Sequence, residues 1–360
     1  MDEHYLQELT DVISTGSGHS YEYALVCRGA LEAGAIRRAA LASVLGGAAF
    51  AMPVYTFDQF AAELGRRLGL PARRSIGDIQ RELLVAECLA QHAAAEAGGG
   101  ELKLLARGAG MTGVARSLAE LFVEWDQAGA DPESLEQALT VGASAGALEA
   151  LALWRRYLDA LRDAGRAENG QLLMRAVRAL EQPAQAAAAH RFTRIRIVGF
   201  PWLSGCEAKL ASALARWGAD VEVEVRHAEP DAFDHMVKAV SPARVRSVPL
   251  ARVEALPHLI AAAGPRREAR AVARKVKKLL ADGAEAPRVW VASADSEGFT
   301  RELLEAFHEF GVPTSAPRKR TMRESPLIAD CLKFAGLVAA EAAGHRDVDV
   351  MPLIASVYLG

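Results

Sequence analysis

The sequence has little cysteine, and its cysteines are widely separated. Four occur in 360 residues, Cys27, Cys88, Cys206 and Cys331, and no two form a Cys-x-x-Cys pair. This spacing argues against the disulfide frameworks of small secreted domains and against paired-cysteine zinc sites. We therefore expect buried, unpaired thiols in a protein of the reducing cytoplasm.

Long hydrophobic runs are also absent. No apolar stretch reaches the roughly 18–20 residues that a bilayer span needs, and the N-terminus lacks the basic and then apolar pattern of a secretion signal. Hydrophobic residues make up 51% of the chain and charged residues 24%, which are proportions typical of globular proteins. We expect a cytoplasmic, nucleoid-associated protein of two or three domains with no membrane partner.

The chain has no excess of positive charge, since its net charge is −3, and this argues against a uniformly basic nucleic-acid-binding surface. Its cations are nevertheless concentrated. The predicted helix after Pro265 carries, beside the single acid Glu268, the cations Arg266, Arg267, Arg270, Arg274, Lys275, Lys277 and Lys278; a second cluster is Arg318, Lys319, Arg320 and Arg323. Such clusters neutralise phosphates and release counterions, which drives sequence-independent DNA binding. The alternative is a solvated helix face whose long side chains cover apolar surface.

The residues that hydrolyse ATP are missing. A phosphate-binding loop needs a lysine, but the chain has no Gly-Lys dipeptide, and the glycine-rich segment Thr15–Ser20 has His19 where that lysine would stand. Magnesium needs an acid at a strand end, but the predicted strand Ile195–Val198 is followed by Gly199 and Phe200. We predict no ATPase activity, and no catalytic, cofactor-binding or metal-binding residues in this stretch.

Two kinds of pattern divide the chain. Strand and helix patterns alternate in residues 1–70 and 181–256, with strands predicted at 23–27, 50–55, 195–198 and, near a sheet edge, 220–226. Residues 71–180 show only helical patterns, which lie at Ile79–Ala97, Gly113–Ala128, Ala147–Ala164 and Gln171–Leu180. A further helix is predicted to begin at Pro132. Residues 227–255 are weakly patterned and predict a surface loop.

This order predicts an α/β fold. A first domain, residues 1–70 and 181–256, would hold a parallel sheet split by a helical insertion at 71–180. A second domain would begin at residue 257, with strands at 259–263 and 288–293 and helices after each of them.

Three tryptophans lie in predicted apolar elements. Trp125 and Trp154 fall on helical faces and Trp290 falls within a predicted strand, so we expect these three in the core. Trp202 lies in a loop after a strand and is the one placed to stack on bases.

Several segments occur in an order that resembles the N-terminal region of the AddB-type subunit of ATP-dependent helicase/deoxyribonucleases. They are Val54–Ala61 (T-F-x-x-F entering a helix), Ile195–Glu207 (which contains I-x-G-F-x-x-L-x-x-x-E), His258–Ala273 (a strand and an E-x-x-x-V-A helix), Phe310–Pro313 (a Gly-Val-Pro turn), and Ser325–Leu327 with Ser356–Leu359. Each motif is short and unspecific alone. Their order and spacing carry the resemblance along nearly the whole chain.

The resemblance implies a UvrD-like helicase fold: a RecA-like 1A domain, a 1B-like helical insertion and the start of a second RecA-like domain. It also implies a partner, the helicase/nuclease A-type subunit, and a PD-(D/E)XK nuclease domain with iron–sulphur cysteines farther along the chain. We expect that domain, its cluster and any Mg²⁺ beyond residue 360, and no cofactor in this stretch. The missing lysine and acid depart from family members that keep a phosphate-binding loop, which puts nucleotide binding here in doubt.

These observations favour a non-catalytic, helicase-like scaffold that guides single-stranded DNA during repair of double-strand breaks. The candidate DNA contacts are Arg266, Arg267, Arg270 and Arg274, then Arg318, Lys319 and Arg320, with Trp202, Thr56 and Phe57 at the strand ends, where α/β proteins bind ligands. One alternative is a small-molecule transferase on a two-domain α/β fold, which needs a convergent polar pocket at the strand ends. Another is a purely structural interaction protein without DNA contacts.

Overall fold

The computed structural model describes residues 3–15, 21–43, 52–96, 105–108, 111–139, 144–182, 192–227, 230–249, 260–293, 298–315 and 334. The chain forms two compact units, Met1–Val253 and Glu254–Gly360. Residues 16–20, the cluster Arg318, Lys319 and Arg320, and the segments Ser325–Leu327 and Ser356–Leu359 lie outside the described residues.

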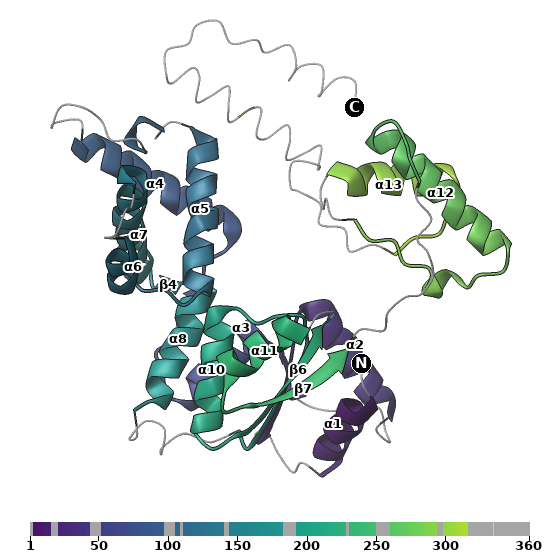
Figure 1. The fold of residues 1–360 in the computed structure, drawn as a ribbon, viewed down its shortest axis with the longest axis horizontal. Coiled ribbons are helices and arrows are strands. Elements are labelled where there is room, and N and C mark those ends of the chain that lie inside the picture. Colours follow the sequence, from purple (N-terminus) through teal and green to yellow (C-terminus); the bar gives the residue numbers. More distant parts are fainter. Residues whose placement is uncertain are drawn as a thin grey trace, which may run out of the picture. The chain divides into compact units, whose positions relative to one another are not determined.

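The first unit is built on a five-stranded sheet, of which Figure 1 labels β6 and β7. Its strand order is β2-β1-β5-β6-β7. Every pairing within it is parallel. The strands are β1 (Tyr23–Cys27), β2 (Val54–Thr56), β5 (Arg194–Phe200), β6 (Asp220–His227) and β7 (Arg244–Pro249). The predicted α/β fold with a parallel sheet is therefore confirmed.

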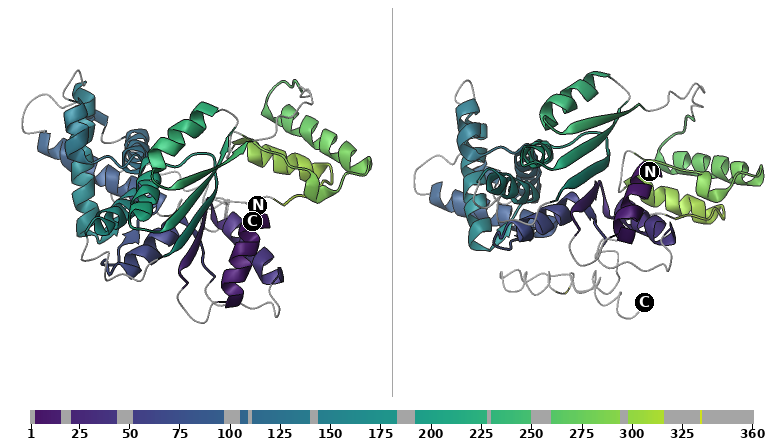
Figure 2. Two further views of the ribbon diagram at one scale, coloured as in Figure 1. Left: turned by 60° about the horizontal axis from the view of Figure 1, so that its bottom comes forward. Right: turned by 90° about the horizontal axis from the view of Figure 1, so that it is seen from below.

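Helices cover both faces of this sheet (Figure 2). Helices α1 (Glu3–Thr15) and α2 (Ala30–Ser43) pack on one face, and α3 (Phe57–Arg67), α8 (Asn169–Leu180), α10 (Gly205–Arg216) and α11 (Pro230–Val240) pack on the other. Successive strand side chains point to opposite faces. In β1, Leu25 joins the core under α1 and α2, while Ala24 and Val26 join the core on the other side. This double burial explains why the strand is apolar without alternation.

The helical insertion has a core of its own. Helices α4 (Asp78–Glu96), α5 (Thr112–Gln127), α6 (Pro132–Leu139) and α7 (Ala145–Asp163), with the short 3-10 turn η1 (Ala106–Gly108), pack around Phe122, Trp154 and Tyr157. A two-stranded parallel pair, β3 (Arg74–Ser75) and β4 (Arg166–Ala167), joins the two ends of the insertion. Helix α8, which we predicted as its last helix, packs on α3 and α10 beside the sheet.

Residues 227–255, which we predicted to be a surface loop, contain α11 and the edge strand β7. In the register of β6 with β7, Glu222 lies opposite Arg244 and Glu224 opposite Arg246. Opposite charges across neighbouring strands stabilise their pairing. Because β7 is paired through charged residues, its sequence has too few apolar residues for hydrophobic alternation to predict a strand.

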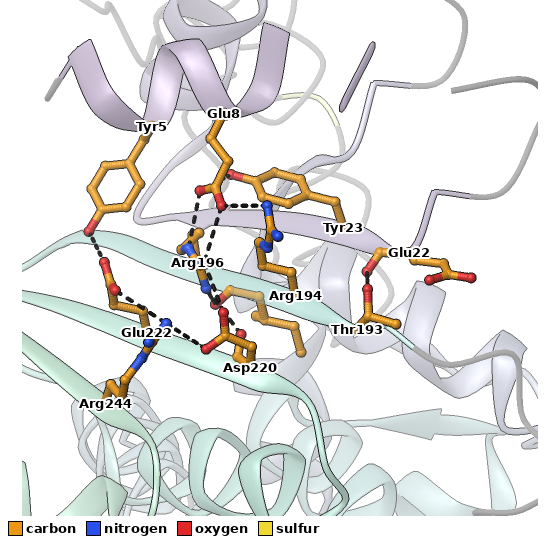
Figure 3. Close-up of polar contacts among 11 residues, drawn as sticks. Tyr5, Glu8, Glu22, Tyr23, Thr193, Arg194, Arg196, Asp220, Glu222 and Arg244 are labelled. Atoms are coloured by element: carbon orange, nitrogen blue, oxygen red, sulfur yellow. Dashed lines mark hydrogen bonds and ion pairs between the residues drawn. The ribbon is translucent and has the colours of Figure 1, made fainter. Parts of the chain in front are cut away.

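An ion-pair network fastens α1 to the sheet (Figure 3). Glu8 accepts hydrogen bonds from Arg194 and from the buried Arg196, whose Nη2 also lies 3.0 Å from Asp220 Oδ2. Burial alone would lower the pKa of Arg196, but Asp220 and Glu8 outweigh it and raise that pKa. Arg194 and Asp220 begin their strands, so the network lies at the amino ends and serves the fold.

The second unit contains α12 (Pro265–Ala281), the 3-10 turn η2 (Ala286–Arg288) and α13 (Gly298–Glu309). Helices α12 and α13 share a small core that includes Ala273 and Phe307. The strands predicted at 259–263 and 288–293 are wrong for the part the structure describes, since residues 260–263 and 289–293 form no strand. Trp290, which we expected in the core, is 89% exposed, and in the described part of the chain its segment pairs with no strand.

Candidate functional site

The sheet of the first unit has a topological switch point between β1 and β5. The chain leaves β1 through α2 toward β2 on one side, and leaves β5 through α10 toward β6 on the other. In open parallel sheets, ligands bind outside the carboxyl ends of the strands at such a point. Arg28 and Gly29 follow β1 here, and Pro201 and Trp202 follow β5.

The carboxylate of Glu32 occupies the switch point. Glu32 lies in the first turn of α2, and its Oε2 accepts the backbone N–H of Arg28 at 3.3 Å. The carboxylate lies against Gly199, where a Cβ would be only 2.6 Å from Glu32 Oε1. Gly199 also has a φ of +81°, a conformation that glycine adopts without strain.

This arrangement changes what the α2 N-terminus can bind. Exposed N–H groups and the helix dipole make such an end a ready site for phosphate. Here the chain supplies the anion itself, through Glu32. A phosphate at this position would have to displace the carboxylate and overcome its negative charge.

Two of the predicted contacts, Thr56 and Phe57, serve the fold. Thr56 caps α3: its Oγ1 accepts the N–H of Gln59 at 3.4 Å, and the Gln59 side chain accepts the N–H of Thr56 at 3.2 Å. Phe57 is buried and packs edge-to-face on Phe200, with ring centroids 5.1 Å apart. Phe57 therefore cannot stack on a base without leaving the core.

The same aromatic pair joins two of the segments that carry the family resemblance. Phe57 belongs to the T-F-x-x-F segment and Phe200 to the segment that ends at Glu207. Ser204 and Glu207 of the latter form a capping box at the start of α10. Both segments thus have structural reasons for their sequences and meet at the carboxyl edge of the sheet.

Trp202 is the exposed aromatic residue at this edge. It lies between β5 and α10 with 67% of its surface exposed. An exposed indole in a loop fixed by a helix cap is a suitable platform for a base.

The predicted basic helix is α12, and its cations form one exposed face. Arg266, Arg270, Arg274 and Lys278 recur every four residues, so they form a row of about 18 Å at 1.5 Å per residue. The buried Ala269, Ala273 and Val276 occupy the side toward α13. All the cations of the helix are exposed: Arg266, Arg267, Arg270, Arg274, Lys275, Lys277 and Lys278.

One cation of this face is paired within the unit. Arg270 forms an ion pair with Glu309 of α13. Within the described ranges, no carboxylate lies within ion-pair distance of the other six cations of α12. Their charge is available to a polyanion.

The first turn of α12 carries cations at the positive end of the helix dipole. Gly264 caps it without a side-chain hydrogen bond, Pro265 follows, and Arg266 and Arg267 occupy the positive first turn. A cation at a helix N-terminus is unfavourable by about 0.3–1 kcal/mol, and Glu268 alone offsets it. This charge pattern disfavours the helix but favours a bound polyanion.

The sequence reasoning missed Glu32. The available signal was an acid in the first turn of the helix that follows the first strand. Its carboxylate could be placed only once β5 and Gly199 were known to lie beside β1.

No protein-family model matches the chain, and no curated protein matches it. None of the described helices combines the length and apolar character that a membrane span requires. Within the described ranges, no three His, Cys, Asp or Glu side chains gather closely enough to hold a metal ion.

Proposed function

We propose that this chain is the helicase-like, non-catalytic part of a DNA double-strand-break repair helicase–nuclease subunit. It guides single-stranded DNA and scaffolds a partner helicase subunit of the A type. The finer fold assignment belongs to the proposal: a UvrD-like RecA domain with a 1B-like insertion, followed by the start of a second RecA-like domain. A parallel sheet split by a helical insertion supports it, as does the meeting of two family-like segments at Phe57 and Phe200.

The exposed cationic face of α12 is the observation that carries DNA binding. Each phosphate neutralised on a single strand contributes a slope of about −0.7 to the dependence of log affinity on log salt. Four cations in one row therefore predict a slope of about −3. Binding of this kind does not depend on base sequence.

The Glu32 carboxylate supports a non-catalytic role. It lies at the N-terminus of α2, the helix after the first strand, where a parallel α/β domain commonly binds phosphate. It also lies against Gly199, the position at the end of β5 where ATP hydrolysis would need an acid. The same residues count against the transferase alternative, because a carboxylate and a buried aromatic pair occupy the strand ends. A purely structural protein differs from the proposal in having no affinity for DNA.

Fluorescence anisotropy with a labelled oligo(dT) of about 20 nucleotides tests the proposal, at about 50 and 200 mM salt and with or without ATP and Mg²⁺. We expect affinity that falls steeply with salt and does not respond to ATP. The variant Arg266→Glu/Arg274→Glu should bind at least about tenfold more weakly.

The matched control is Arg288→Glu/Arg301→Glu. It makes the same charge change in the same unit, at exposed residues outside α12. The control should bind within about twofold of the unmodified chain. Absence of binding at low salt, or equal losses in the two variants, would contradict the proposal.

A further inference from the structure

A cavity of about 540 Å³ lies in the first unit, between the helical insertion and helices α8 and α10. This volume is within the roughly 300–1,000 Å³ range of small-molecule sites. None of its lining residues belongs to the switch point or to α12. They include five cations, Arg73, Arg162, Arg175, Arg178 and Lys209, and three acids, Asp126, Asp131 and Glu133.

Three of the cations have no carboxylate partner among the residues that the structure describes. Arg175 and Arg178 lie three residues apart on one face of α8, and Arg73 precedes β3. Burial, and then the nearby charge of Arg73, lower the pKa of Arg175. Arg175 Nη2 donates to the carbonyl of Pro71 at 3.1 Å, and within the described ranges none of the three arginines forms an ion pair. Like charges gathered in this way are stabilised by a bound anion.

The other two cations have partners. Lys209 Nζ donates to the carbonyl of Gly129 at 2.9 Å. Arg162 forms an exposed ion pair with Asp159 at 2.9 Å.

Two of the three acids are engaged in the fold. Asp131 accepts hydrogen bonds from the Oγ and N–H of Ser134, which lower its pKa. Asp126 Oδ2 accepts the N–H of Gly170 at 2.6 Å, and burial raises the pKa of Asp126 to about 7. Asp126 is therefore only partly charged at neutral pH, and the exposed Glu133 stands at the start of α6. The cations outnumber the charged acids of the lining.

A buried hydrogen-bond donor is a second observation, independent of charge. Trp154 lines the cavity with 1% of its surface exposed, and its Nε1–H has no hydrogen-bond acceptor in the described part of the chain. Its ring is held edge-to-face against Trp125, with centroids 5.2 Å apart. Buried donors in folded proteins normally have an acceptor, and a ligand oxygen in the cavity would supply one if the indole turned toward it.

We propose that this cavity binds the phosphate group of a nucleotide, held by Arg73, Arg175 and Arg178. Planar guanidinium groups bind phosphate oxygens in pairs, which suits arginine better than lysine for this task. Leu158 and Met174 provide apolar surface for the remainder of the nucleotide. The phosphate belongs either to a free nucleotide or to the 5′ end of a DNA strand. This site does not depend on α12, which belongs to the other unit.

Isothermal titration of the full chain with pyrophosphate and with dTMP tests the site. We expect binding, and at least about tenfold weaker binding to Arg175→Gln/Arg178→Gln. The matched control, Arg66→Gln/Arg116→Gln, removes two exposed cations of the same unit from elsewhere and should bind as the unmodified chain does. Trp154→Phe keeps an aromatic ring but removes the N–H, and should weaken binding severalfold.

The single variant Arg178→Gln serves if the double variant does not fold, because Arg178 is exposed. A 5′-phosphorylated oligo(dT), titrated in the Arg266→Glu/Arg274→Glu background, distinguishes the two sources. If the oligonucleotide binds more tightly than pyrophosphate and dTMP, and only when it carries the 5′-phosphate, the site takes the end of a DNA strand. If pyrophosphate and dTMP bind at least as tightly as the oligonucleotide, the site takes a free nucleotide.

Two results would overturn the proposal. One is that no phosphate-bearing probe binds the intact chain at millimolar concentration. The other is that Arg175→Gln/Arg178→Gln and Arg178→Gln bind as the control does. Failure of α12 to bind DNA would leave pyrophosphate binding unchanged, so the two proposals fail separately.

Discussion

Gly170 lies so close to Asp126 that no side chain fits between them. A Cβ at Gly170 would stand 2.4 Å from both the backbone oxygen and Oδ2 of Asp126. The backbone N–H of Gly170 donates to that same Oδ2. At Gly205, a Cβ would stand 2.2 Å from the carbonyl oxygen of Ala128. These contacts join the end of α5 to the beginnings of α8 and α10, so they fix the insertion to the sheet.

Gly170→Ala should therefore destabilise the first unit. The added methyl group collides with backbone and with a hydrogen-bonded carboxylate, and such overpacking lowers the free energy of unfolding by about 1–3 kcal/mol. Gly113→Ala is the control, because Gly113 lies in α5 with open space around its α-carbon. Alanine there should stabilise by up to about 1 kcal/mol. Urea unfolding measures both, and similar midpoints for the two variants would refute the close contact.

The pKa of Asp126 predicts a pH dependence of stability. Burial, then the charge of Glu168, raise the pKa of this carboxyl from 3.8 to about 7, and the backbone N–H groups of Gly170 and Gln171 partly oppose them. Between these values, the unfolded chain loses a proton that the folded chain keeps. Asp126 therefore makes the fold less stable as pH rises from about 4 to about 7, and its penalty is constant above that range.

Asp126→Asn should remove this part of the pH dependence. We expect the variant to gain roughly 4 kcal/mol relative to the unmodified chain on going from pH 4 to pH 8, since the pKa of Asp126 is raised from 3.8 to about 7 and one pKa unit corresponds to about 1.4 kcal/mol. Urea unfolding at several pH values measures the difference. A difference between the two proteins that does not change with pH would show that Asp126 titrates normally.

Gly199→Ala should destabilise the sheet for two separable reasons. The residue has a φ of +81°, and a Cβ there would meet Glu32 Oε1 at 2.6 Å. We expect the free energy of unfolding to fall by about 2 kcal/mol. Adding Glu32→Ala should restore the part that is due to the collision but not the part that is due to backbone strain. A double-mutant cycle by chemical denaturation measures this coupling. Strictly additive effects would mean that the two residues do not touch.

The described cysteines should be inert in the folded protein. Cys27, Cys88 and Cys206 are buried and unpaired, as their spacing predicted. Burial raises the pKa of Cys27 to about 11 and of Cys206 to about 12, and the thiolate is the reactive form. Iodoacetamide near pH 8 should modify these three only in urea, which peptide mass spectrometry can follow. Rapid modification of any of them without urea would contradict their burial.

Much of the first unit could be predicted because its signals are local. Apolar runs placed β1 and β5, and helical periodicity with glycine or proline boundaries placed α4, α5 and α7 within about two residues. The prediction failed where pairing decides the structure. β7 is held by charged cross-strand pairs, and the apolar run around Trp290 forms no strand without a partner.

The candidate site shows the same division. The cationic face of α12 is a helical pattern, and the structure exposes it as expected. Phe57 was proposed as a DNA contact, but its burial depends on Phe200, a residue that only the β2-β1-β5 strand order brings close. The cations of the cavity come from four separate places in the chain, before β3 and in α7, α8 and α10, so no local motif reveals them.

The short β3–β4 pair at the base of the insertion bears on how the chain folds during synthesis. Thr193, beside β5, contacts Glu22, beside β1, across 171 positions, and closing so long a loop costs chain entropy. Arg166 contacts Ser75 across 91 of those positions, and the insertion between them has its own hydrophobic core. An insertion that folds first would hold its own two ends together, so that β5 would leave the ribosome close to the first half of the sheet domain. The folded helices would then shorten the effective loop between β1 and β5 and so favour the assembly of the sheet.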